Sequence, residues 1–125
     1  MDDPQKCPHL EISGLTLVDN TGRRRATIGL MDEAGMPSFR LYDSNQRERI
    51  VIGLDKDDTP HFAMLRGDGK ALVGVGVDGR GNVGMTLYDL AGNIKVIVQA
   101  SDADGGAVMI YDAKGECVWA APPAE

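Results

Sequence analysis

Closely spaced carboxylates beside turns are the residues of this chain that most resemble a chemical site. Asp55 and Asp57 lie two positions apart, and Asp102 and Asp104 repeat that spacing before two glycines. Carboxylates in such loops can bind Ca²⁺, but a calcium loop supplies about six to eight oxygens and usually includes a distant glutamate. Neither segment has a glutamate at the required position. We therefore interpret these four residues as turn formers and only as weak metal candidates.

Three tyrosines form a second group of interest. Tyr42, Tyr88 and Tyr111 each stand directly before an aspartate. Aromatic rings on the outer face of a sheet can stack on sugar rings, which makes these residues candidates for a ligand face. The more ordinary interpretation is a packing column beside a turn, because cross-strand aromatic neighbours stabilise a sheet.

Motifs for catalysis are missing from the sequence. The serines Ser13, Ser38, Ser44 and Ser101 lie outside any Gly-x-Ser-x-Gly motif. The glycines of residues 74–79 do not fit the spacing of a dinucleotide-binding loop. We expect no enzymatic activity and no cofactor.

The two cysteines and two histidines do not complete a site. Cys7 and His9 lie two apart, but His61 is the only other histidine, so a tetrahedral zinc site lacks ligands within one chain. We interpret Cys7 and Cys117 as free thiols, and the sequence leaves open whether they pair.

The aspartates and tyrosines recur because the chain repeats itself. Five related segments end at positions 19, 43, 66, 89 and 112, so the steps are 24, 23, 23 and 23 residues. Arg66 stands where the other copies have aspartate. A fixed period of this size is typical of a domain built from one repeated supersecondary unit.

Each copy continues into a turn signal. Four of the five copies have glycine three positions after the anchor, where a hairpin often needs a left-handed residue. The exception is Gln46. Because Asn45 tolerates a positive φ better than most residues, the sequence predicts that this turn shifts by one residue.

Apolar residues alternate on both sides of each turn, which predicts half-buried strands rather than helices. The short connections favour antiparallel hairpins, so we expect an all-β meander of about ten strands of about six residues. The predicted domain spans residues 10–121, with tails at 1–9 and 122–125. We expect Trp119 on the core side as a plug near the chain end. The predicted core register is Ile28, Leu41, Ile52, Met64, Val75, Leu87, Val98 and Ile110.

One sheet with one apolar face needs something to cover that face. The chain can close into a monomeric barrel, coil as a solenoid, or bring three copies together as a triangular β-prism. The core side chains are mostly of moderate size, with only Phe39, Phe62 and Trp119 large, and would fill a ten-strand barrel poorly. We therefore favour a homotrimer around a threefold axis.

The charge composition limits the classes of partner that the protein can bind. The net charge is −6 with a pI near 4.8, which disfavours nucleic acid as a partner. The sequence shows neither a secretory signal nor an apolar stretch that would span a membrane, so we expect no membrane insertion and leave the location open between cytoplasmic and virion-associated.

Residues 10–121 resemble a repeat of uncharacterised bacterial proteins with tandem Leu-x-Leu-Tyr-Asp-x-x-Gly-Lys-x-Arg-x-x-Ile-Gly-Leu-Asp-x-(Asp)-Gly units. Phe39-Arg-Leu-Tyr-Asp43 and Arg49-Ile-Val-Ile-Gly-Leu-Asp55 carry the resemblance best. More loosely, the chain is similar to the β-repeat shafts of phage tail fibres and trimeric adhesins. The resemblance implies a repeat architecture and supplies no catalytic residues.

These observations predict a non-enzymatic structural or interaction module that assembles with copies of itself. Another protein or a glycan is a further partner that the sequence allows. The alternative is a ligand-binding β-domain that recognises carbohydrate or calcium through its outer-face tyrosines or its acidic turns.

Overall fold

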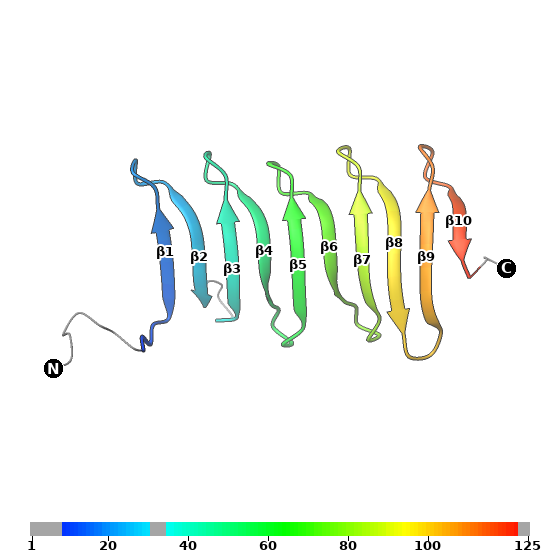
Figure 1. Cartoon of the computed structure of the whole chain (residues 1–125), viewed down its shortest axis with the longest axis horizontal. Coiled ribbons are helices and arrows are strands. Elements are labelled where there is room, and N and C mark those ends of the chain that lie inside the picture. The colour runs from blue at the N-terminus through cyan, green and yellow to red at the C-terminus, as the bar shows by residue number, and fades with distance from the viewer. Residues whose placement is uncertain (1–8, 31–34, 123–125) are drawn as a thin grey trace.

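The computed structural model describes residues 9–30 and 35–122. These residues form ten β-strands within a single sheet (Figure 1). The strands are β1 Gly14–Val18, β2 Arg24–Leu30, β3 Pro37–Tyr42, β4 Glu48–Leu54, β5 Pro60–Leu65, β6 Ala71–Val77, β7 Val83–Tyr88, β8 Ile94–Ser101, β9 Gly105–Tyr111 and β10 Cys117–Ala121. The expected all-β meander is confirmed. In the described part of the chain, no helix has the length and apolar character needed to cross a membrane.

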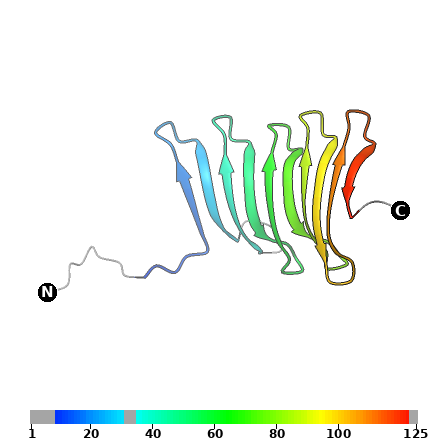
Figure 2. The same cartoon turned by 45° about the vertical axis from the view of Figure 1, so that its right-hand side comes forward.

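Every strand pairs antiparallel with its neighbour in sequence, so the order in the sheet runs from β1 to β10 without a crossover. The sheet is one twisted layer, and the chain enters and leaves at its opposite ends (Figures 1 and 2). β1 and β10 are its two edge strands and do not pair with each other. The sheet is therefore open, and the chain does not form the monomeric barrel that the sequence allowed.

Turns at the two long edges of the sheet connect the strands (Figure 1). We call those that follow β1, β3, β5, β7 and β9 the upper turns, and those that follow the even-numbered strands the lower turns. In the upper turn after β3, the N–H of Asp43 donates to the carbonyl of Arg47, and the N–H of Gln46 donates to the carbonyl of Asp43, both at 2.9 Å. The other four upper turns and the lower turns that begin at Asp55 and Asp78 repeat this pair of bonds.

The prediction that the turn of the second copy would shift by one residue to Asn45 was wrong. Gln46 itself takes the left-handed conformation, with φ of 61°, and the turn keeps the geometry of its neighbours. The hydrogen bonds between the two flanking strands fix the length of this turn. A shift of the turn would break several of these bonds, and the free energy lost would exceed the cost of one strained φ. The side chain of Gln46 is also engaged, because its Oε1 accepts a bond of 3.1 Å from the N–H of Arg24.

A β-bulge follows every upper turn. Each of the five upper hairpins shows a register shift one step from its turn, whereas the four pairings across the lower turns show none. The register makes one residue of each even-numbered strand the extra, unpaired one. These residues are Arg25, Arg49, Leu72, Lys95 and Val118. Because a bulge absorbs one residue, the strand beyond it keeps its apolar positions on the same face.

One face of the sheet is continuously apolar, and we call it the apolar face. Two rows of paired residues cross all ten strands on this face, and none of the twenty positions carries a polar side chain. The first row is Leu15, Ile28, Phe39, Ile52, Phe62, Val75, Met85, Val98, Val108 and Ala121. The second row is Leu17, Ala26, Leu41, Ile50, Met64, Val73, Leu87, Val96, Ile110 and Trp119.

The opposite face is the better protected one in a single chain. Thr27, Tyr42 and Val51 all lie on it, and their exposed fractions are 1%, 6% and 7%. The guanidinium of Arg24 covers the Tyr42 ring at 4.1 Å from its centroid. The single chain therefore does not bury its predicted core register. Trp119 in particular is 52% exposed on edge strand β10 and is not a plug within one chain.

The lower turn after β4 offers a clean test of the turn geometry. Asp58 has φ of 61° and occupies the left-handed position, whereas Asp57 does not. A left-handed conformation costs an ordinary residue about 1 kcal/mol, and glycine avoids that cost. We expect Asp58→Gly to raise the melting temperature by about 4 °C. Asp57→Gly removes the same charge and should lower it, so equal shifts for the two variants would contradict this assignment.

Candidate functional site

The structure does not gather the acidic candidates into a metal site. Within residues 9–30 and 35–122, no group of three or more His, Cys, Asp or Glu side chains could hold a metal ion. The Oδ1 atom of Asp55 accepts bonds from the N–H groups of Asp57 and Thr59, at 2.8 and 3.1 Å. Asp102 and Asp104 lie in the short turn between β8 and β9. Asp55 is thus used by its own turn, as expected for a turn former.

The three tyrosines lie on the face opposite the apolar rows, as the alternation predicts. Tyr42 is buried beneath Arg24, and its hydroxyl lies 3.4 Å from Oγ1 of Thr27, so its ring is closed to a ligand. The hydroxyl of Tyr111 lies 3.7 Å from the sulfur of Met109 on the same strand. These contacts are those of packing residues.

Tyr88 borders a shallow hollow of about 410 Å³ on that same face. Three glycines of β6 and β7, Gly74, Gly76 and Gly84, form much of its floor, so missing side chains create the hollow. Thr86 and Gln99 supply polar groups at its margin. The hollow is open to solvent, and His61, Asp78 and Asn82 also line it.

The apolar face offers a much larger surface. A hollow of about 520 Å³ near its lower end is lined mainly by aliphatic side chains and by Phe39. Ile28 and Ile52, both in the first row, are 51% and 46% exposed. All eight residues of the predicted core register lie on this face, five of them exposed and the other three, Leu41, Val75 and Leu87, half-buried. Large continuous apolar surfaces are typical of interaction sites, so this face is the candidate functional site.

Aspartates at the turn starts hold the two edges in shape. The Oδ1 of Asp43 accepts bonds from the N–H groups of Asn45 and Arg47, and its Oδ2 accepts one from Nε of Arg47 at 3.1 Å. Such bonds favour the charged form, so the pKa of Asp43 is held below its usual value, chiefly by the backbone N–H of Arg47. Backbone N–H groups are likewise the chief cause of the lowered pKa values of Asp55, Asp78 and Asp89. For Asp19, the chief cause of the lowered pKa is the hydrogen bond from the Thr21 side chain.

Cations at three of the bulges tie neighbouring hairpins together. Nε of Arg49 donates to the carbonyl of Leu65 at 2.8 Å, and its Nη1 lies 3.3 Å from Oδ2 of Asp43. Arg25 donates to the carbonyl of Tyr42 in the equivalent position, and Lys95 donates to the carbonyl of Asp112, one residue further along its repeat. Each cation thus bridges its own turn and the following hairpin. Sequence reasoning missed this role, although the spacing of Arg25, Arg49 and Lys95 by one and then two repeats was a usable signal.

The thiol of Cys117 is exposed at the start of β10 and lies 3.4 Å from the carbonyl of Trp119. Cys7 lies outside the described residues. No protein-family model matches this chain, and no curated protein matches it significantly. The candidate site therefore rests on the geometry of the apolar face alone.

The turn aspartates predict how stability depends on pH. The pKa of Asp89 is lowered from 3.8, chiefly by the backbone N–H of Asn93. A lowered folded-state pKa stabilises the fold above the unfolded value, and that contribution is lost as the pH falls through the folded value. We expect the urea midpoint to be flat near neutral pH and to fall below about pH 4.

Asp89→Asn keeps an oxygen acceptor at Oδ1 but carries no charge. Its urea midpoint should be lower than that of the unmodified chain at pH 7, and the difference should shrink toward pH 2. A difference that grows on acidification would contradict the assignment of Asp89.

Proposed function

We propose that this protein is a non-enzymatic structural module whose chains associate through the apolar face, as a homotrimer with a triangular cross-section. The observation that supports the proposal is the pair of uninterrupted apolar rows across ten strands of an open, single-layer sheet. A lone layer leaves both rows in contact with water, and stable sheets bury such a face against another layer.

The dimensions of the sheet suit three copies. A strand of six or seven residues is about 20 Å long at about 3.3 Å per residue. In a triangular column with sides of about 20 Å, each sheet lies about 6 Å from the axis, close to half the spacing of packed sheets. Side chains of moderate size, such as Val, Ile, Leu and Met, fill that depth. Two facing sheets would also bury the rows, but they would leave the apolar layer open along both turn edges.

The proposed role is mechanical. Hydrogen-bonded strands lie across the column, and their repetition gives a stiff shaft whose length is set by the number of repeats. The cations at the bulges add bonds between successive hairpins, which resist bending of one repeat against the next. The outer face remains free to present a surface to other proteins.

A charge on the apolar face should prevent association. In Ile52→Asp, three carboxylates would meet near the axis of each assembly, where burial of unpaired charge is costly. We expect this variant to sediment as a monomer or to lose its β-sheet circular dichroism, with a melting temperature lowered by 15 °C or more, on the order of 4 kcal/mol.

Val118→Asp is the matched control. Val118 is 60% exposed and precedes Trp119 in the bulge of β10, so it points away from the apolar row. Measured in 1 M salt, which screens charges at the edges of the sheet, the same chemical change there should leave the sedimentation coefficient unchanged. Normal assembly and melting of Ile52→Asp would contradict the proposed function.

A further inference from the structure

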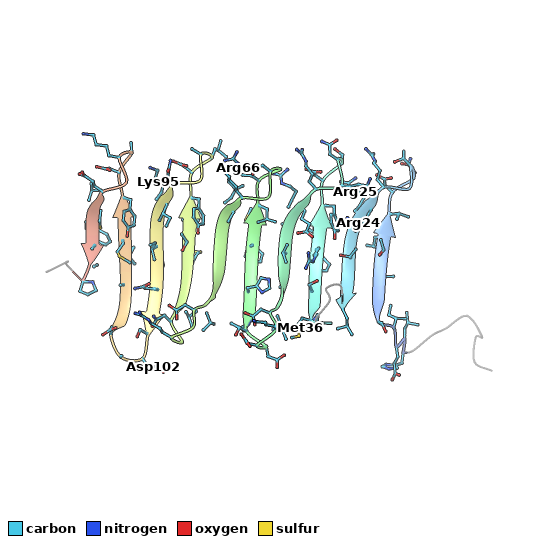
Figure 3. All side chains as sticks on the ribbon, turned by 180° about the vertical axis from the view of Figure 1, so that it is seen from behind. Arg24, Arg25, Met36, Arg66, Lys95 and Asp102 are labelled. Carbon is cyan, nitrogen blue, oxygen red and sulfur yellow. The ribbon has the colours of Figure 1, made fainter. Side chains whose placement is uncertain are left out.

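The two long edges of the sheet carry different charge. The upper edge, formed by residues 19–25, 43–49, 66–72, 89–95 and 112–118, holds nine Lys or Arg and seven Asp or Glu. The described part of the lower edge, residues 55–59, 78–82 and 102–104, holds six aspartates against Lys56 and Arg80. In Figure 3, Arg24, Arg25, Arg66 and Lys95 lie along one edge and Asp102 lies along the other.

The net charge that remains without ion-pair partners has opposite sign at the two edges. At the upper edge, the anchor aspartates 19, 43 and 89 form ion pairs with cations of their own turns. The charges of that edge without an ion pair in the described residues leave a small cationic excess: Arg24, Lys70 and Lys114 against Asp112 and Glu116. At the lower edge, no ion pair in the described part of the chain involves Lys56, Arg80 or any of the six aspartates, which leaves an acidic excess.

One chain cannot neutralise these charges internally. The edges are separated by the length of a strand, about 20 Å, whereas charges in physiological salt are screened beyond about 8 Å. Each edge thus presents its own charge to whatever lies beside it.

We propose that the occupant of each edge is a second copy of this chain, with the acidic lower edge of one chain against the cationic upper edge of the next. This inference rests on the proposed function, because three sheets around an axis meet along their turn edges. All three chains then run in the same direction, with their β1 strands at one end. Contacts between two different edges of identical chains close into a ring at three copies. An inverted neighbour would bring like edges together and is disfavoured by charge.

A double-mutant cycle tests which edges meet. The upper variant is Lys70→Glu with Lys114→Glu, and the lower variant is Asp57→Lys with Asp102→Lys. The control, Asp57→Glu with Asp102→Glu, keeps the lower-edge charge. Sedimentation equilibrium at low salt gives the concentration of half-dissociation, which should rise about tenfold for the upper variant and stay near the unmodified value for the control.

The decisive result is whether the lower changes strengthen or weaken the association of the upper variant. If the two edges meet, adding the lower changes to the upper variant should tighten association by about threefold or more, and the effect should shrink in 1 M salt. If the lower changes loosen the upper variant further, or if neither variant differs from the control while the mass stays at three chains, the edge pairing is wrong and the proposed trimer stands. A monomeric unmodified chain would overturn both.

Discussion

The rest of this structure depends on one constraint: every strand must pair in the register that keeps its apolar side chains on the same face of the sheet. Side chains alternate between faces with a period of two, so a slip of one residue in any pairing would move a whole strand of apolar residues to the other face. Ten strands keep the same phase here because each upper turn closes with the same two backbone bonds and is followed by one bulge residue. Aspartate carboxylates such as that of Asp43 hold these turns, and the cations at three of the bulges hold their hairpins to the following ones.

This regularity leaves apolar surface in contact with water, and one chain has no element that covers it. The more perfectly the alternation is kept, the more completely the apolar side chains gather on one face, and an open meander has no second layer to cover them. The exposed Ile52 and Trp119 are direct consequences. Asp43 and Asp89 are engaged in turn bonds that lower their pKa values. The proposed association of like chains would cover the exposed face without any further element in the sequence.

Most of the fold could be predicted from the sequence, because the repeat places strands and turns by spacing alone. The ten strands, their antiparallel order and the positions of the tyrosines follow from alternation around each Asp-x-x-Gly signal. The features that the sequence did not predict concern either the backbone of a single residue or contacts between several strands. Gln46 takes a left-handed φ that propensity argues against, since the ladder on both sides outweighs the strain of one residue. The burial of Thr27 and Tyr42 involves contacts between strands, with the Tyr42 hydroxyl beside Thr27 and the Arg24 guanidinium over the Tyr42 ring, and no local pattern reveals them. The role of Arg49 at its bulge could be recognised only once the pairing register of β3 and β4 was known.

The central claim is that the apolar face is covered by copies of this chain. The most direct test is the native mass of the unmodified protein, measured by light scattering during gel filtration over a range of loading concentrations. The account predicts a single particle of about three times the chain mass of 13.4 kDa. A folded particle with the mass of one chain at every concentration would contradict it, because a single sheet would then be stable with its apolar rows in water.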